Sequence, residues 1–169
     1  MADYLTEPLG RKHKKSEFSC GNSSLDNYIQ RQAKQDIKRK LSACFILGDS
    51  KGYVIGYYTL SNAGISREVI PEEISKKLPK NYSSLPVTLF GRLAIDENNK
   101  GQGLGKLLLI DALKRSYEVS KVIGSMAVIV DPIDANAIKF YSKYGFIALP
   151  DSGKMFLPMK TIEKLFMGN

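Results

Sequence analysis

The sequence has 169 residues, of which 43% are hydrophobic and 25% are charged, and its net charge is +8. This composition excludes a fibrous or intrinsically disordered protein. The longest apolar runs, such as 107–110 and 126–130, are too short to span a bilayer, and the N-terminus lacks the pattern of a secretion signal. We therefore expect a cytoplasmic protein with no membrane partner, folded as a single domain over residues 1–169. The positive charge favours polyanionic partners, including nucleic acids, without identifying one.

The residues that commonly bind metals are few. Cys20 and Cys44 are the only cysteines and His13 is the only histidine. Neither a disulfide framework nor a metal site is indicated, and we expect two free thiols and no metal. His13 lies in a basic run, 11–15, and is predicted to be a titrating surface residue.

The first half of the chain predicts one helix and one β-hairpin. Capping side chains at 22–24 precede apolar residues at helical spacing, which predicts a helix over 24–39. Its exposed face carries basic residues: Arg31, Lys34, Lys38, Arg39 and Lys40. Residues 42–47 and 53–60 are rich in β-branched and aromatic residues and flank a turn at 48–52, which predicts a hairpin.

The second half alternates strands and helices. The expected elements, in chain order, are a short helix beginning at 71–73, a loop at 79–86, a strand at 87–95, a turn at 96–99, a helix at 104–117, a strand at 122–130, a helix between the capping Asp134 and Gly145, strands at 146–149 and 155–159, and a helix at 161–166. This order favours an α/β unit with parallel strands. The hairpin upstream makes the sheet mixed.

A glycine-rich loop between a strand and a helix is the most informative motif. It reads Lys100-Gly101-Gln102-Gly103-Leu104-Gly105, followed by Lys106. Glycines let backbone N–H groups approach a phosphate, and the helix N-terminus and both lysines add positive charge. An anionic ligand is therefore expected. A glycine-rich turn that merely begins a helix is the alternative.

Two familiar phosphate loops do not fit this motif. A Walker A motif needs Ser or Thr after its lysine, but Lys106 is followed by Leu107. A dinucleotide fingerprint needs a different glycine spacing, since Gly101, Gly103 and Gly105 simply alternate. A nicotinamide cofactor is therefore not expected.

The loop and its flanking blocks together resemble the GNAT superfamily of N-acetyltransferases. The loop follows Gly91-Arg92-Leu93-Ala94-Ile95-Asp96 and precedes a strand that ends at Asp131 and then Asn136-Ala137-Ile138-Lys139-Phe140-Tyr141. The family has Arg or Gln at the first loop position, where this chain has Lys100. The resemblance implies a mixed, mostly antiparallel sheet with a parallel, splayed strand pair, flanked by helices. It also implies acetyl-coenzyme A as co-substrate.

A narrower resemblance is to the GNAT toxins of bacterial toxin-antitoxin modules. It rests on Phe18-Ser19-Cys20-Gly21 with Leu25-Asp26 and Tyr28, and on Gly56-Tyr57-Tyr58-Thr59-Leu60-Ser61, together with the Arg92 block. The endings Phe140-Tyr141 and Tyr144-Gly145-Phe146 agree with it. Such toxins acetylate the α-amino group of aminoacyl-tRNA and are neutralised by a ribbon-helix-helix antitoxin. The resemblance implies the same substrate and partner here, and a homodimer is compatible with it.

The resemblance also assigns roles to individual residues. It makes Tyr141 the general acid that protonates the departing thiolate. Cofactor contacts are implied for Leu93, Ala94, Ile95, Lys100, Gly101, Gln102, Gly103, Leu104, Gly105, Lys106, Asn136 and Phe140. The resemblance also implies a substrate contact for Arg92. The basic residues Lys34, Lys38 and Arg39, together with the basic run at 11–15, are expected from their charge to contact tRNA phosphates, with an ordinary solvated surface as the alternative.

Several alternatives stay open on the sequence alone. Without the resemblance, a buried amphipathic core position is the better explanation of Tyr141. An exposed helix position explains Asn136 equally well, and a polar position on a sheet face is the alternative for Arg92. Asp131, Asp134 and Glu97 are explained by capping and solvated turns, so no catalytic role is expected for them. An acetyltransferase for protein or small-molecule amines, or a non-catalytic nucleic-acid-binding module, would also carry much of this pattern.

Overall fold

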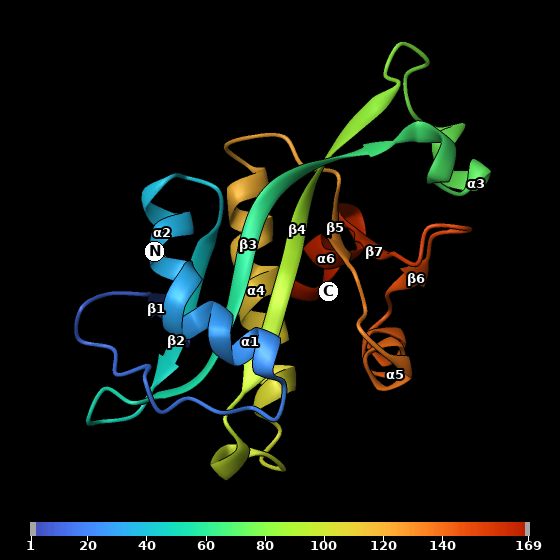
Figure 1. Ribbon diagram of the computed structural model, residues 1–169. Coiled ribbons are helices and arrows are strands. Elements are labelled where there is room, and N and C mark those ends of the chain that lie inside the picture. Colours follow the sequence, from blue (N-terminus) through green and yellow to red (C-terminus); the bar gives the residue numbers. More distant parts are fainter. Residues whose placement is uncertain (1–2, 168–169) are drawn as a thin grey trace. The chain divides into compact units, whose positions relative to one another are not determined.

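The computed structural model describes residues 3–167, so residues 1–2 and 168–169, at the ends of the expected domain, lie outside the described residues. Within this part the strands form a seven-stranded sheet in the order β1-β2-β3-β4-β5-β7-β6 (Figure 1). The chain divides into two compact units. The first contains the residues up to Ser61 together with Phe90–Leu113, and the second contains Asn62–Leu89 together with the residues from Lys114 onward.

The first unit begins with helices and the antiparallel hairpin. Its elements are β1 (Glu7–Pro8), α1 (Ser23–Asn27), a π-helical turn (Tyr28–Gln32), α2 (Ala33–Lys38), β2 (Ala43–Gly48), the first part of β3 (Val54–Ser66), the end of β4 (Ser84–Ile95), a 3₁₀ turn (Glu97–Asn99) and the start of α4 (Leu104–Ser120). Asn22 caps α1 by accepting from the N–H groups of Ser24 and Leu25. The predicted helix and hairpin are both confirmed.

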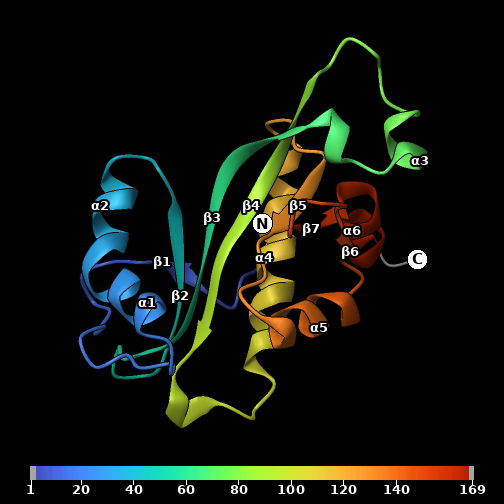
Figure 2. The same cartoon turned by 45° about the vertical axis from the view of Figure 1, so that its right-hand side comes forward.

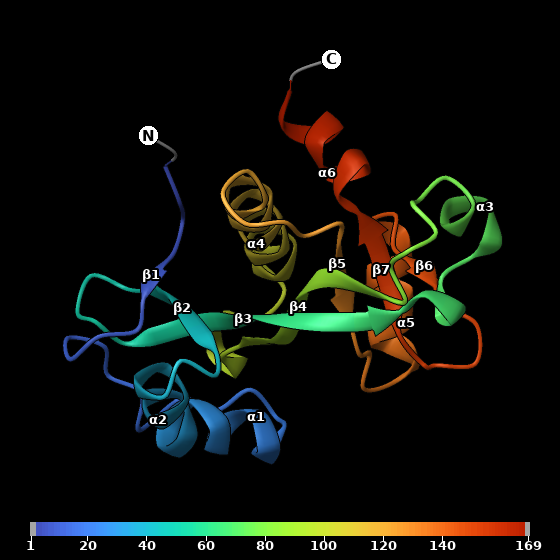
Figure 3. The same cartoon turned by 90° about the horizontal axis from the view of Figure 1, so that it is seen from above.

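Strand β3 is covered by helices on both faces within the first unit. Successive strand side chains point to opposite faces, and Tyr57 donates to the carbonyl of Leu25 in α1 while Tyr58 donates to Asp111 in α4. Figure 3 shows α1 and α2 on one side of β2 and β3. Both tyrosine rings are fully buried.

A buried hydrogen-bond cluster joins the N-terminal segment to α4. The carboxylate of Asp111 accepts from the Leu5 backbone N–H at 2.6 Å, from the Thr6 hydroxyl at 2.6 Å and from the Tyr58 hydroxyl at 2.8 Å. Asp111 and Thr6 are only 6% and 5% exposed. A buried carboxylate is tolerated when hydrogen bonds satisfy it, and here three donors do so.

Gly56 in β3 leaves no room for a side chain. A Cβ atom there would lie 2.9 Å from Ile95 Cδ1, 3.0 Å from the Ala94 carbonyl oxygen and 3.0 Å from Leu108 Cδ1. We expect Gly56→Ala to lower the free energy of unfolding by about 2 kcal/mol, because overpacking against backbone cannot be relieved by a rotamer change. Urea denaturation measures this. Gly124→Ala, where a Cβ would meet nothing within 4 Å, is the control, and equal stability of both variants would contradict the expectation.

The second unit contains the parallel strand pair and the C-terminal helices. Its remaining elements are a 3₁₀ turn (Arg67–Val69), α3 (Glu72–Ser75), β5 (Ala127–Val130), α5 (Ala135–Lys143), β6 (Ile147–Ala148), β7 (Met155–Pro158) and α6 (Met159–Phe166). Strands β4 and β5 pair in parallel over Thr88↔Val128 and Leu89↔Ile129, and β5 pairs with β7 antiparallel. Helix α6 packs beside β5 and β7 (Figure 2). The predicted mixed sheet with one parallel pair is confirmed.

Arg67 holds together the segment that connects the end of β3 to the start of β4. Its guanidinium donates to the backbone carbonyls of Ser75, Leu78, Pro79 and Tyr82. A guanidinium carries five donors in a fixed fork, so one side chain holds several turns of this segment together.

Three predicted boundaries and one helix type are wrong. The strand predicted at 53–60 continues as β3 to Ser66. Residues 122–126 are not strand, because α4 continues to Ser120 and the chain then turns through hydrogen bonds from Val122 and Ile123 to Val119. Only the fully buried Ala127–Val130 joins the sheet. The predicted loop at 79–86 ends earlier, since β4 already begins at Ser84. The first helix contains a π turn, in which the Ala33 N–H donates to Tyr28.

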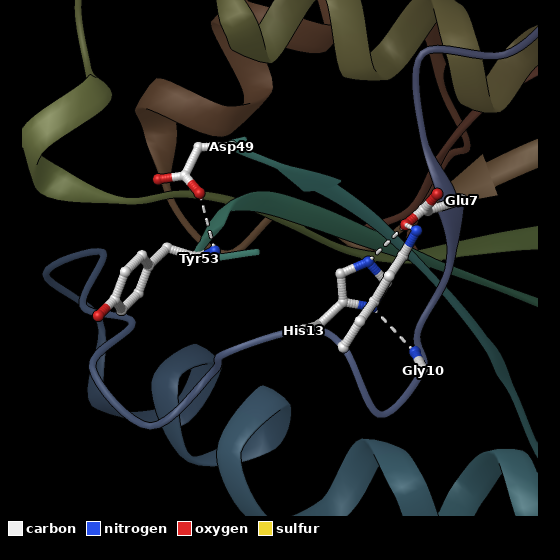
Figure 4. Close-up of polar contacts among 6 residues, drawn as sticks. Glu7, Gly10, His13, Asp49 and Tyr53 are labelled. Atoms are coloured by element: carbon white, nitrogen blue, oxygen red, sulfur yellow. Dashed lines mark hydrogen bonds and ion pairs between the residues drawn. The ribbon is translucent and has the colours of Figure 1, made fainter. Parts of the chain in front are cut away.

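His13 is not the surface residue that the sequence predicts. It is 8% exposed, its Nδ1 accepts from the Gly10 N–H at 2.9 Å, and its Nε2 lies 2.9 Å from Glu7 Oε1 (Figure 4). The turn at Gly10 folds the imidazole inward while the lysines beside it stay exposed. Hydrogen bonds from Lys12 and then His13 lower the pKa of Glu7. Acceptance at Nδ1 places the proton of a neutral His13 on Nε2.

No helix among residues 3–167 is long and apolar enough to cross a membrane. In the same part of the chain, no group of three or more His, Cys, Asp or Glu side chains is arranged to hold a metal ion.

Candidate functional site

The glycine-rich loop links the end of β4 to the start of α4. Asp96 caps the 3₁₀ turn by accepting from the Asn98 N–H, and the chain then reaches Gly101 and Gly103, whose φ angles are +82° and +73°. Only glycine adopts this left-handed backbone at low cost. A Cβ at either glycine would meet no atom within 4 Å, so the backbone there is open to an approaching ligand.

The charge around this loop suits an anion. Lys100, Gln102 and Lys106 are exposed, and Leu104 and Gly105 begin α4. The first N–H groups of a helix have no intrahelical acceptor, and the helix dipole is positive at this end. Backbone N–H groups, a dipole and two ammonium groups are the donor set that a pyrophosphate requires. The loop therefore fits the phosphates of coenzyme A.

The last residues of β4 lie directly before this loop. Ala94 is buried, and Leu93 and Ile95 are half-buried. The Ile55 carbonyl accepts from the Asp96 N–H at 2.7 Å, which fixes where the strand ends. Strand ends of this kind can offer backbone groups to an extended ligand.

Lys100 also makes a contact that the sequence did not predict. Its ammonium donates to the carbonyl oxygen of Cys20 at 2.5 Å, although Cys20 is far away in sequence. The family resemblance assigned Lys100 to the cofactor alone. In the structure it also ties the start of the loop to the segment before α1.

Arg92 stacks on an aromatic ring in the first unit. Its guanidinium carbon lies 3.5 Å from the centre of the Tyr28 ring, and the Tyr28 hydroxyl donates to Asp36 at 2.9 Å. Burial, and then the hydrogen bond to Asp36, raise the pKa of Tyr28 to about 12. The toxin resemblance includes Tyr28 without giving it a contact with Arg92, and in the structure Tyr28 belongs to the π turn, a feature often found at functional sites.

Three of the basic residues expected to contact substrate lie together on or just after α2. Lys34 and Lys38 are exposed within α2, and Arg39 is its C-cap. The first unit therefore contains the loop, the end of β4, Arg92 and this basic helix face. Their arrangement gives the first unit an anion-binding loop and a cationic surface.

Tyr141 is a buried phenol on α5 in the second unit. It is 9% exposed, and its ring lies 5.3 Å from the rings of both Phe140 and Phe146. Burial raises its pKa above the usual tyrosine value. Tyr141 is therefore protonated at neutral pH and holds a proton that it can donate.

The other expected cofactor residues of the second unit share helix α5 with Tyr141. Asp134 caps this helix by accepting from the Ala137 N–H at 2.8 Å. Asn136 is exposed in the first turn, and Phe140 is half-buried between the rings of Tyr141 and Tyr144. One capped helix therefore orients all three expected residues.

Each of the three carboxylates has a structural partner, and only that of Asp134 was predicted from the sequence. Asp134 is the α5 cap, as predicted. Asp131 pairs with Lys154 at 2.8 Å on the surface. Glu97 lies in the 3₁₀ turn and accepts from the Ser19 hydroxyl at 3.4 Å.

Cys20 and Cys44 are buried free thiols. Burial, and then a hydrogen bond to Asp26, raise the pKa of Cys20 to about 11. Burial raises the pKa of Cys44 to about 12.

Comparison with known proteins identifies the family. Residues 80–161 match the acetyltransferase (GNAT) domain. The chain is 30% identical to a probable toxin TacT of Sinorhizobium fredii, covering 97% of this chain and 96% of that protein. It is 32% identical to a tRNA-acetylating toxin of Mycobacterium tuberculosis, covering 89% of each.

Solved structures agree with this result. The toxin AtaT complexed with acetyl-methionyl-tRNAfMet superposes with a TM-score of 0.88 at 30% identity, covering 97% of this chain and 99% of that one. AtaTR bound with acetyl-coenzyme A gives 0.84 at 30% identity, covering 98% and 99%. A tyrosine-to-phenylalanine mutant of AtaT, bound to the C-terminus of the antitoxin AtaR and to acetyl-coenzyme A, gives 0.79 at 26% identity, covering 95% and 96%. The chain belongs to the GNAT superfamily of N-acetyltransferases, in the group that contains these toxins, and it uses acetyl-coenzyme A as acetyl donor.

Proposed function

We propose that this protein is the toxin of a toxin-antitoxin pair and acetylates the α-amino group of aminoacyl-tRNA, which blocks translation. The observation that carries the proposal is the likeness, over 89% of each chain, to a tRNA-acetylating toxin. The likeness to AtaT in complex with acetyl-methionyl-tRNAfMet supports the same class of acceptor. The net charge of +8 suits a polyanionic substrate.

The first unit supplies the donor-binding part of the reaction. The loop from Lys100 to Lys106 binds the pyrophosphate, and backbone groups of Leu93, Ala94 and Ile95 orient the thioester arm. Arg92, held on the Tyr28 ring, faces the acceptor. Lys34, Lys38 and Arg39 contact tRNA phosphates, which contributes affinity without sequence choice.

The second unit supplies the proton for the leaving group. The neutral amine attacks the thioester carbonyl carbon, so a C–N bond forms and the C–S bond breaks. Tyr141 donates its hydroxyl proton to the departing thiolate, and the extra proton on the attacking nitrogen leaves the tetrahedral adduct to solvent, which gives the neutral amide. Asn136 and Phe140 contact the donor from the same helix. An α-amino group has a pKa of about 7.7 to 8.0, and an ester neighbour lowers it, so no dedicated base is needed.

The partners follow from the same likeness. AtaT binds the C-terminus of the antitoxin AtaR, and we propose a ribbon-helix-helix antitoxin for this chain. We further propose that the chain acts in the cytoplasm, as one domain over residues 1–169 and as a homodimer. Size-exclusion chromatography with light scattering tests the dimer, and co-purification with the neighbouring gene product tests the antitoxin.

The proposal is tested by following labelled acetyl groups from acetyl-coenzyme A. Charged tRNA, uncharged tRNA, free amino acids and basic peptides are offered as separate acceptors. We expect label only with charged tRNA, released together with the amino acid when the ester is hydrolysed. Label on peptides or free amines instead would support an acetyltransferase for other amines. Failure to bind acetyl-coenzyme A would support a non-catalytic module.

The pH dependence of the reaction follows from the two titrating groups. The rate should rise through the pKa of the substrate amine, because only the neutral amine attacks. The raised pKa of Tyr141 keeps the acid protonated beyond the usual tyrosine value of about 10, so no falling limb is expected between about pH 6 and pH 9. Initial rates across this range check this. A falling limb present in the wild type and missing in Tyr141→Phe would contradict it.

A further inference from the structure

Two segments that are far apart in sequence are joined at the start of the donor loop. The Ser19 N–H donates to Asp96 at 3.1 Å, and the Ser19 carbonyl accepts from the Glu97 N–H at 2.8 Å. The Lys100 ammonium donates to the Cys20 carbonyl at 2.5 Å. We call this set of contacts, made by Ser19, Cys20, Asp96, Glu97 and Lys100, the junction.

The junction lies at the beginning of helix α1 as well. The Cys20 N–H donates to Asp26 at 2.8 Å, and Asn22 caps the helix. Between them, Gly21 has a φ of +89°, and a Cβ there would lie 3.2 Å from Glu97 Oε1 and 3.6 Å from Lys100 Nζ. The two segments are therefore in close contact where α1 starts and where the loop starts.

The Lys100 ammonium is held in place by a hydrogen bond, in addition to carrying a positive charge. Its ammonium has three donors, and one of them is held by the Cys20 carbonyl. Lys100 directly precedes Gly101, whose left-handed backbone begins the open part of the loop. A fixed Lys100 therefore restricts the backbone of the loop before any ligand arrives, and pre-organisation of this kind strengthens binding.

We propose that Lys100 is a positioning residue, and that the junction couples binding of acetyl-coenzyme A at the loop to the order of the first turn of α1. The inference rests on the proposed function, because it assumes that the loop binds the donor. It adds a link between the donor loop and the segment of the chain that leads to Tyr28 and the basic face of α2.

Acetyl-coenzyme A titrations by calorimetry test the first part. We expect Lys100→Met to weaken binding about tenfold, the effect of losing one charge-assisted hydrogen bond, and Lys100→Arg to restore most of it. KM for acetyl-coenzyme A should rise by the same factor, with kcat at saturation unchanged. Lys51→Met, the same substitution at an exposed turn, is the matched control and should bind as the wild type does.

Asp96→Asn separates positioning from simple charge attraction. Asparagine still caps the 3₁₀ turn but has one acceptor oxygen for two N–H donors, those of Ser19 and Asn98. If Lys100 and its surroundings act only through charge, removing a nearby carboxylate should tighten anion binding. The junction predicts the opposite, a several-fold weaker affinity. Tighter or unchanged binding by this variant would overturn the proposal.

Hydrogen exchange tests the coupling to α1. Saturating acetyl-coenzyme A should slow exchange of the amides at 20–27 in the wild type and in Lys51→Met, but much less in Lys100→Met. Equal slowing in all three proteins would contradict the coupling. A wild type that does not bind acetyl-coenzyme A would instead refute the proposed function, so the two failures are distinguishable. Circular dichroism of each variant verifies that it is folded.

Discussion

Replacing Tyr141 by phenylalanine is expected to lower kcat by about 10² to 10⁴-fold, the usual contribution of a general acid, while the affinity for acetyl-coenzyme A stays near that of the wild type. Phenylalanine keeps the ring that packs on Phe140 and Phe146 and removes only the hydroxyl. The fold should therefore be preserved. Steady-state kinetics with charged tRNA, together with calorimetry for the donor, measures both quantities.

Tyr144→Phe is the matched control for this substitution. Tyr144 is the C-cap of the same helix, and its ring also contacts Phe140. The Tyr144 hydroxyl has no role in proton transfer in the proposed mechanism. The turnover of Tyr144→Phe should therefore stay within a few-fold of the wild type. Equal turnover by Tyr141→Phe and the wild type would remove Tyr141 from the acid role. An equal loss of turnover in Tyr141→Phe and Tyr144→Phe would show that turnover depends on the polarity of the α5 rings and not on a proton from Tyr141.

The largest effect on stability is expected at Asp111. Replacing it by alanine removes the carboxylate to which the Thr6 hydroxyl, the Tyr58 hydroxyl and the Leu5 N–H all donate. A hydrogen bond to a charged group contributes roughly 1.5 to 3 kcal/mol, and the loss of three such bonds is partly offset because a buried carboxylate is also removed. We expect the free energy of unfolding to fall by about 3 kcal/mol. Urea denaturation followed by circular dichroism measures the change.

A surface variant on the same helix serves as control. Glu118 forms an exposed pair with Lys121 at 3.4 Å, and such pairs contribute about 0 to 1 kcal/mol. Glu118→Ala should therefore change stability far less than Asp111→Ala. Asp111→Asn should fall between the two, because its amide oxygen can satisfy only part of the cluster. Near-equal stability of all three variants would contradict the structural role assigned to Asp111.

Much of the local fold could be predicted because its signals are local. The capping residues Asn22 and Asp134 and the helix end at Gly145 lie where the sequence placed them. The strand boundary at 122–126 was missed because Val122 and Ile123 are apolar but exposed, at 89% and 56%. Hydropathy alone does not distinguish an exposed apolar turn from a buried strand.

The contacts around the candidate site were harder to predict, because they join residues far apart in sequence. Nothing in the basic run around His13 shows that its imidazole is buried against Glu7 and Gly10. The stacking of Arg92 on Tyr28 and the tie between Lys100 and Cys20 likewise depend on the tertiary fold. The motif predicted an anion-binding loop at 100–106, and the tie between its first residue and Cys20 is seen only in the structure.

The central claim is that the acetyl group is transferred to the α-amino group of the amino acid on tRNA. The most direct measurement is mass spectrometry of the nuclease digest of charged tRNA after incubation with enzyme and acetyl-coenzyme A. We predict that the aminoacyl-adenosine from the 3′ end gains the mass of one acetyl group on its amino nitrogen, and that Tyr141→Phe greatly reduces this product. Unmodified aminoacyl-adenosine with the wild-type enzyme across all charged tRNAs would contradict the claim.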